Sequence, residues 1–134
     1  MTRSQARENA FILIFEKIFN PENSFEDMKA LAEEAEIFEI DDFTGLLYKT
    51  AEEYCEQSDA LIEKYSKGWK LNRLSKVVLS ILRLAVAEIV AIDDIPASVS
   101  ANEAVELAKK YASAEDAAFI NGILGSVIRG LSAE

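Results

Sequence analysis

Histidine is absent from this 134-residue sequence, and cysteine occurs once, as Cys55. Without histidine the chain lacks the most frequent general base and the commonest metal ligand in proteins. A single cysteine excludes both an internal disulfide and a paired-cysteine zinc site, and it is typical of proteins kept in a reducing cytoplasm. Glycine-rich phosphate loops and the GxSxG nucleophile motif are also missing. We therefore expect a cytoplasmic binding protein with no cofactor and no metal, not an enzyme.

Glycine and proline are scarce, with five and two residues. So few turn-forming residues argue against a many-stranded sheet, while an apolar content of 50% is too high for a disordered chain. The longest apolar run, Ala10 to Phe15, is too short to cross a membrane. The opening MTRSQAREN lacks the features of a secretory signal. We expect a single domain over residues 1–134 with no membrane contact.

The formal net charge of −10 is concentrated in one part of the chain. Residues 25–66 carry thirteen acidic and three basic side chains, whereas residues 1–24 and 67–134 are each neutral. The stretch from Lys67 to Ala87 contains five cations and no acid. Because salt screens exposed charges beyond about 10 Å, an acidic protein can still present a local anion-binding surface. Basic and acidic faces that merely offset each other are the alternative.

Apolar residues recur at helical spacing through nearly the whole chain, and no strand-length alternation is found. Asn20-Pro21 ends the first helix, because the residue before proline is pushed out of the α region. Helix starts are marked by Ser24, by Asp41 or Asp42, by Ser98 and by Ser113. The third segment has a polar middle where it is expected to bend or break. We expect an all-α bundle of six to seven helices, over residues 4–19, 25–35, 42–65, 74–92, 99–111 and 114–130.

The segment from Leu74 to Ile92 is apolar on almost every face, which predicts a central, buried helix. Its charged residues Arg83 and Glu88 are five positions apart, too far round the helix to pair well with each other. Each is therefore expected to reach a partner elsewhere. Trp69, in the link before this helix, is expected to fill the core, and Cys55 is expected to be a buried thiol.

The pair Asn121-Gly122 lies within FING, and Asn-Gly is a frequent hairpin turn. Helix-forming sequence on both sides places it inside the last helix instead. Small residues recur there at every fourth position, which predicts a stripe along which another helix packs closely. Such packing would offset the loss of about 1 kcal/mol that each helical glycine causes relative to alanine. The stripe consists of Ala118, Gly122, Ser126 and Gly130.

Five stretches, taken together in their order and spacing, resemble the NusB family of bacterial transcription antitermination factors over the whole chain. They are AREN at 6–9, ILRLAVAEI at 81–89, IP at 95–96, NEAVELAKKY at 102–111 and FINGIL at 119–124. The resemblance implies two helical subdomains and a non-enzymatic role. It also implies binding of boxA-type single-stranded RNA in nascent ribosomal-RNA transcripts, together with a small ribosomal-subunit protein, NusE. The complex would help RNA polymerase resist termination.

The resemblance also implies RNA contacts at both ends of the chain. An arginine-rich arm usual in the family is thinned here to Arg3, Gln5 and Arg7. Cations at a helix start oppose the helix dipole, and a bound phosphate would offset that cost. Phe119 corresponds to an aromatic that can stack on an unpaired base, with a core position as the alternative. Phe15 is a second aromatic candidate, although its neighbours look like core.

Asn121 could bond a base edge or only a neighbouring carbonyl. The implied protein partner docks near the start of the helix at about residue 74, where family members carry acidic side chains. This sequence has cations there instead, so the surface could serve RNA through Lys76. The residues expected at the partner surface are Asn72, Arg73, Val78 and Arg83.

The sequence is also compatible with two other hypotheses for the function. The chain could be a protein–protein module that docks through its acidic segment 25–66. It could also be an accessory domain of a ribosomal-RNA methyltransferase, although no Rossmann-like domain or catalytic cysteine is present. The apolar first helix is compatible with a monomer and with a homodimer.

Overall fold

The computed structural model describes residues 1–133, which form seven α-helices, one short 3-10 helix and no strand. This confirms the predicted all-α fold. None of the described helices combines the length and apolarity that a membrane crossing requires. The elements are α1 (Arg3–Phe19), α2 (Phe25–Glu34), α3 (Asp42–Glu53), α4 (Cys55–Tyr65), η1 (Leu71–Arg73), α5 (Lys76–Ala91), α6 (Ala97–Tyr111) and α7 (Ala114–Ser132).

Local capping signals account for most of the helix starts. Ser24 and Ser113 each accept a hydrogen bond from the backbone three residues on, and Asp27 and Asp116 return one, which completes two capping boxes. Both starts were predicted from the sequence. The predicted break in the third segment is also present, because α3 ends and α4 begins on either side of Tyr54.

The start of α6 differs from the prediction. Ser98 was expected to cap this helix, but the helix begins at Ala97 and Pro96 is its N-cap. Pro96 has φ −58° and ψ 134°, and its carbonyl already accepts hydrogen bonds from the amides of Val99 and Ser100. Ser98 therefore lies inside the first turn. The fixed φ of proline suits a helix entry and replaces the side-chain cap.

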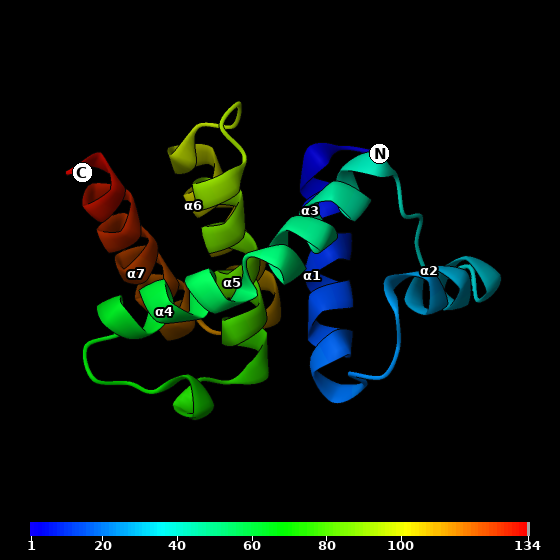
Figure 1. The fold of residues 1–134 in the computed structure, drawn as a ribbon, viewed down its shortest axis with the longest axis horizontal. Helices are drawn as coiled ribbons and strands as arrows, with labels where there is room; N and C mark the ends of the chain where they lie inside the picture. Colours follow the sequence, from blue (N-terminus) through cyan, green and yellow to red (C-terminus); the bar gives the residue numbers. More distant parts are fainter. Residues whose placement is uncertain (134) are drawn as a thin grey trace.

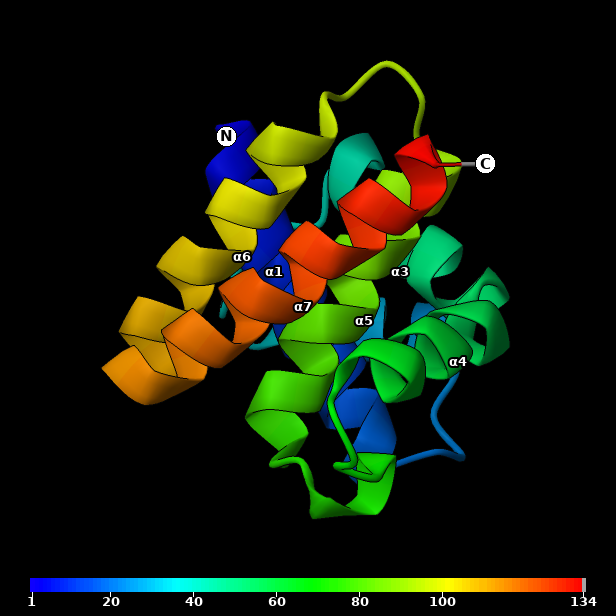
Figure 2. The ribbon, with the colours of Figure 1, turned by 90° about the vertical axis from the view of Figure 1, so that its left-hand side faces the viewer.

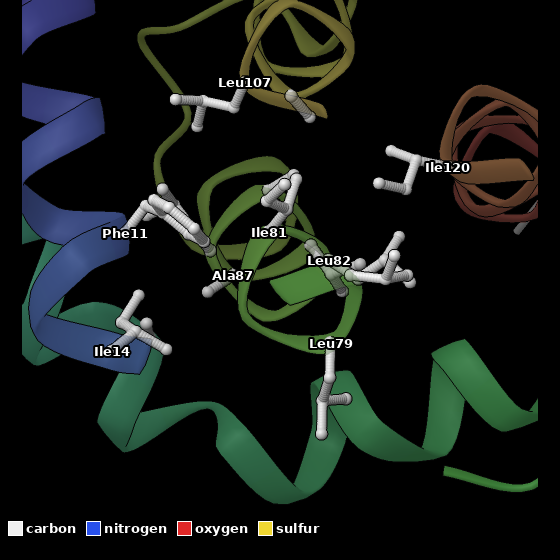
Figure 3. Packing of buried hydrophobic residues seen from close by; sticks show 14 of the residues in the cluster. Phe11, Ile14, Leu79, Ile81, Leu82, Ala87, Leu107 and Ile120 are labelled. Carbon is white, nitrogen blue, oxygen red and sulfur yellow. The ribbon is translucent and has the colours of Figure 1, made fainter. Parts of the chain in front are cut away.

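The core is built around α5, as its continuous apolarity predicts. This helix contacts α1, α3, α4, α6 and α7, and its buried positions include Ile81 and Leu82, which are fully inaccessible. Figure 3 looks along α5 and shows Phe11 and Ile14 of α1, Leu107 of α6 and Ile120 of α7 around it. The buried positions of α5 run from Val78 to Glu88 with Arg83 as the exception, and its first and last turns are partly open to solvent.

The remaining helices form two groups joined by α5. The first group pairs α1 with α3, and the second pairs α6 with α7 and α4 with α7. Figure 1 shows α2 standing to one side of the first group, beyond α1 and α3. It is anchored by Phe25, whose ring stacks on Tyr48 at 5.2 Å, and by the buried Met28. Figure 2 shows α7 crossing in front of α5, with α6 on one side and α4 on the other.

Asp41, the N-cap of α3, makes a testable contribution to stability. Its carboxylate accepts hydrogen bonds from the hydroxyl and the amide of Thr44, at 2.6 and 2.8 Å, and these bonds lower the pKa of Asp41. A lowered pKa means that the contribution is complete above the ordinary carboxyl pKa and is lost as pH falls through the folded-state value. Asp41→Ala should cost about 1 kcal/mol at pH 7.

Asparagine keeps the capping oxygen at every pH. Asp41→Asn should therefore stay close to the wild type at pH 7 and lose less stability than the wild type between pH 5 and pH 3, as measured by urea unfolding at each pH. Equal acid sensitivity in the two proteins would show that the Asp41 carboxylate is not the titrating cap.

Candidate nucleic-acid interface

The sequence-predicted RNA residues fall on separate surfaces. Gln5 lines a groove between α1 and α6, together with Glu8, Glu103 and Lys110. Phe119 lines a different groove, between α7 and the end of α4. These two grooves share no lining residue. The candidate residues therefore belong to at least two surfaces.

At the start of α1, the exposed side chains take part in local contacts. The Arg3 guanidinium lies 4.5 Å from the centre of the Phe43 ring, a cation–π contact that leaves Arg3 exposed. The Gln5 side-chain oxygen accepts a hydrogen bond from the Thr2 amide at 2.9 Å and completes a capping box. Both side chains remain at the surface, where the Gln5 amide group can still donate.

Arg7 does not lie at the surface, in contrast to the prediction. Its side chain is 3% exposed, and it donates two hydrogen bonds to one Glu88 oxygen at 2.9 and 2.6 Å. A third nitrogen lies 3.6 Å from Glu103. This pairing confirms that Glu88 reaches a partner elsewhere, and it removes Arg7 from the candidate RNA surface. A buried carboxylate in an apolar helix needs a cation, and Arg7 on the neighbouring helix provides it.

Phe15 is half-buried and belongs to a ridge of three aromatic rings along α1. Its ring centre lies 6.2 Å from that of Phe11 and 5.0 Å from that of Phe19. Phe19, at the end of the helix, is 58% exposed. The ridge therefore runs from the core at Phe11 to the surface at Phe19, with Phe15 between the two environments.

Phe119 lies in the α7 groove, a hollow of about 400 Å³ between α7 and the chain that follows α4. The ring is half-buried and packs partly on the core. Asn121 is exposed but does not line this groove, because residues two apart point to different faces of a helix. The groove is lined by Tyr65, Ser66, Lys67, Trp69, Ala118, Phe119, Gly122, Ile123, Ser126 and Arg129.

The small-residue stripe of α7 is not packed against another helix along its length, so that prediction is wrong at Gly122. A Cβ atom built on Gly122 meets no atom within 4 Å, whereas one built on Gly130 would lie 2.3 Å from the Tyr65 hydroxyl. Only the Gly130 end of the stripe permits a close approach. The Gly122 part forms the open floor of the α7 groove.

Gly122→Ala is expected to stabilise the protein by about 1 kcal/mol, because alanine has the higher helix propensity and its methyl group enters open space. Gly130→Ala is the matched control, and it should gain little or lose stability because Tyr65 must move. Urea unfolding monitored by circular dichroism measures both. A loss of stability in Gly122→Ala would contradict an open groove at this position.

Trp69 was predicted to fill the core, but its side chain is 53% exposed. Lys67 and Gly68 have φ angles of 52° and 93°, so the chain reverses sharply after α4. The buried Ser66 hydroxyl lies 2.5 Å from the Trp69 carbonyl and donates to it, which fixes the turn. The indole is consequently held outside the core, where it lines the α7 groove.

The expected partner surface is only partly available. Asn72 and Arg73, in η1, are exposed, as is Lys76 in the first turn of α5. Val78 is 3% exposed and belongs to the core, so it cannot contact a partner directly. Arg83 was expected to reach a structural partner, and it does. It binds both oxygens of Asp59 at 2.8 and 2.9 Å.

Cys55 lies beside this ion pair, with its sulfur 3.9 Å from Asp59. Burial, followed by the charge of Asp59, raises the pKa of the Cys55 thiol. The thiol is therefore held neutral. Cys55 was predicted to be buried, but its side chain is only half-buried.

Sequence reasoning missed the residues that complete the α7 groove. Trp69, Lys67 and Arg129 come from segments about sixty residues apart and meet only in the folded chain. A lysine–glycine pair directly before the tryptophan was the one local signal of an exposed turn, because glycine favours a left-handed conformation.

The sequence profile of the NusB family matches residues 4–129 of this chain. A protein named transcription antitermination protein NusB from Natranaerobius thermophilus is 43% identical, covering 98% of each chain. One of the same name from Agathobacter rectalis is 46% identical over 92% of this chain and 97% of the relative. A solved structure of antitermination factors NusB and NusE in complex with double-stranded RNA has a TM-score of 0.81 and 30% identity, covering 97% of this chain and 99% of that chain.

Proposed function

Because the chain belongs to the NusB family, we propose that it is a transcription antitermination factor. It binds boxA-type single-stranded RNA in nascent ribosomal-RNA transcripts, together with the small ribosomal-subunit protein NusE. This assembly joins the transcribing RNA polymerase and helps it resist termination. The role is regulatory and involves no chemistry on a substrate.

The observation that carries this proposal is the chemistry of the α7 groove. A half-buried phenylalanine and an exposed tryptophan line it together with Lys67 and Arg129, and no carboxylate is among the described residues that line it. The chain as a whole has a net charge of −10, so a groove whose charged lining residues are both cations differs from the average surface. Aromatic faces beside cations are the combination by which proteins hold unpaired bases and their phosphates.

The residues of the proposed interface have different roles. Phe119 stacks on a base in the groove, and Phe15 is a second aromatic contact on α1. The exposed side chains of Arg3, Gln5, Lys76 and Asn121 contact phosphates or base edges outside the groove. Asn72 and Arg73 are the exposed members of the partner surface. Arg7 and Val78 support these surfaces from the core.

An in vitro transcription assay tests the function directly. The template carries a boxA-type element upstream of a terminator, and RNA polymerase is supplied with NusE, with or without this chain. The chain should raise the fraction of transcripts that pass the terminator. A template with a scrambled element is the control and should show no increase. Equal readthrough on both templates, or none on either, would contradict the proposal.

A further inference from the structure

Trp69 occupies a position that core packing does not explain. It is the single tryptophan of the chain and is 53% exposed. It lines both the α7 groove and a second hollow of about 370 Å³, the loop groove, whose lining consists of Lys67, Gly68, Trp69, Lys70 and Arg73. A large exposed aromatic side chain that borders two hollows is a typical contact residue, since it offers apolar area with few rotatable bonds.

We propose that Trp69 is a second base-stacking position for single-stranded RNA. The RNA runs from Phe119 through the α7 groove, passes the indole and continues along the loop groove. This inference rests on the proposed RNA-binding function and adds to it a defined extension of the binding path.

The charges around Trp69 favour a polyanion over other ligands. Lys67 belongs to both hollows, Arg129 to the α7 groove, and Lys70 and Arg73 to the loop groove. No acidic side chain within residues 1–133 lines either hollow. Cations therefore lie in both hollows that Trp69 lines. This arrangement suits a single strand whose base stacks on the indole and whose phosphates continue in both directions.

The turn that carries Trp69 is held by hydrogen bonds within the chain. Ser66 is 1% exposed, and its hydroxyl donates its one hydrogen to the Trp69 carbonyl at 2.5 Å, with the Glu63 carbonyl 3.1 Å away. The Trp69 amide donates back to the Ser66 carbonyl at 3.3 Å. Binding therefore needs little ordering of the backbone, which lowers the entropic cost of using this loop as a stacking platform.

The floor of the α7 groove is open at Gly122. Gly122 is exposed, and the space above it is open to at least 4 Å from a built Cβ atom. Phe119 and Trp69 both line this groove, so the two stacking faces belong to one path.

Because Trp69 is the only tryptophan, intrinsic fluorescence of the wild-type protein reports on this residue alone. The probe is a boxA-type single-stranded oligoribonucleotide carrying fluorescein. It is titrated in low salt, once without and once with NusE. Tryptophan quenching is read only in the titration without NusE, because NusE could contribute tryptophan emission of its own. Tryptophan quenching and fluorescein anisotropy should saturate at the same protein-to-RNA ratio. Trp69→Ala should weaken RNA binding by roughly 5- to 150-fold, the equivalent of one stacked base. Trp69→Phe should lose less, and Ile37→Ala, an exposed apolar residue outside both hollows, should bind like the wild type.

Salt dependence provides a second readout. Lys67→Gln and Arg129→Gln should each reduce the slope of log affinity against log salt by about 0.7, as expected for one lost phosphate contact with a single strand. Lys29→Gln, on α2 and outside both hollows, is the matched control and should leave the slope unchanged.

The outcomes separate this inference from the proposed function. RNA binding by anisotropy without tryptophan quenching, together with unchanged affinity in Trp69→Ala, would overturn the stacking role while leaving RNA binding intact. If Trp69→Ala weakened only the binding of NusE, the surface would be a protein interface and the inference would fall. If the wild type bound no RNA with or without NusE, both proposals would fail.

Discussion

Replacing Arg7 by methionine is expected to lower the free energy of unfolding by about 3–5 kcal/mol, because it leaves the Glu88 carboxylate buried without a cation. Glu88 is 2% exposed and Arg7 is 3% exposed, so water cannot replace the lost partner without a rearrangement of α1, α5 and α6. Methionine retains much of the aliphatic volume of arginine, so the loss reports mainly on charge. Urea unfolding followed by circular dichroism at pH 7 measures it.

The double variant Arg7→Met/Glu88→Met is the matched control. Replacing both members of a buried ion pair by apolar side chains is often close to neutral, so the double variant should recover most of the stability. At a temperature where circular dichroism shows it folded, Arg7→Met should also bind RNA with an affinity within a few-fold of that of the wild type. The Arg7 side chain is only 3% exposed and is therefore not available to RNA. A stable single variant with strongly weakened RNA binding would instead show that Arg7 contacts RNA directly.

Replacing Phe119 by alanine is expected to weaken RNA binding by about 1–3 kcal/mol, or roughly 5- to 150-fold, through the loss of one stacked base. The ring lines the α7 groove and is only partly packed on the core. Some loss of stability will accompany the loss of binding, so affinity must be measured at a temperature where circular dichroism shows a folded protein. Fluorescence anisotropy of a labelled boxA-type RNA provides the dissociation constant.

Two further variants separate stacking from packing. Phe119→Tyr keeps an aromatic face and should retain most of the affinity. Ile128→Ala removes a half-buried apolar side chain from the same helix but outside the groove, and it should lose stability without losing RNA binding. If Phe119→Ala and Ile128→Ala had equal affinities for RNA, Phe119 would be only a packing residue.

Features determined by neighbouring residues could be read from the sequence. Ser24 and Ser113 start their helices through capping boxes, and Asn20-Pro21 ends α1, because these effects involve contacts within one turn. The apolar periodicity of α5 placed it correctly at the centre of the core. Even the need of Arg83 and Glu88 for outside partners follows from the energetics of buried charge.

Features determined by long-range placement could not be read in this way. The partner of Glu88 depends on how α1 crosses α5. That crossing buries Arg7 against Glu88, although Arg7 was predicted to contact RNA. Trp69 is apolar enough for the core, but a left-handed turn at Lys67 and Gly68 turns it outward. A Cβ atom at Gly122 would meet no atom within 4 Å, whereas one at Gly130 would meet Tyr65, which is distant in the sequence. For Arg7 and Gly122 the deciding neighbour lies far away in the sequence, whereas for Trp69 it is the adjacent turn.

Titration of a fluorescein-labelled boxA-type RNA with this protein, in low salt and with NusE present or absent, tests the central claim most directly. We expect a saturable rise in anisotropy, a lower dissociation constant when NusE is present, and a loss of affinity as salt is added. A scrambled RNA of equal length should bind more weakly. No rise in anisotropy at low salt with NusE present would contradict the account.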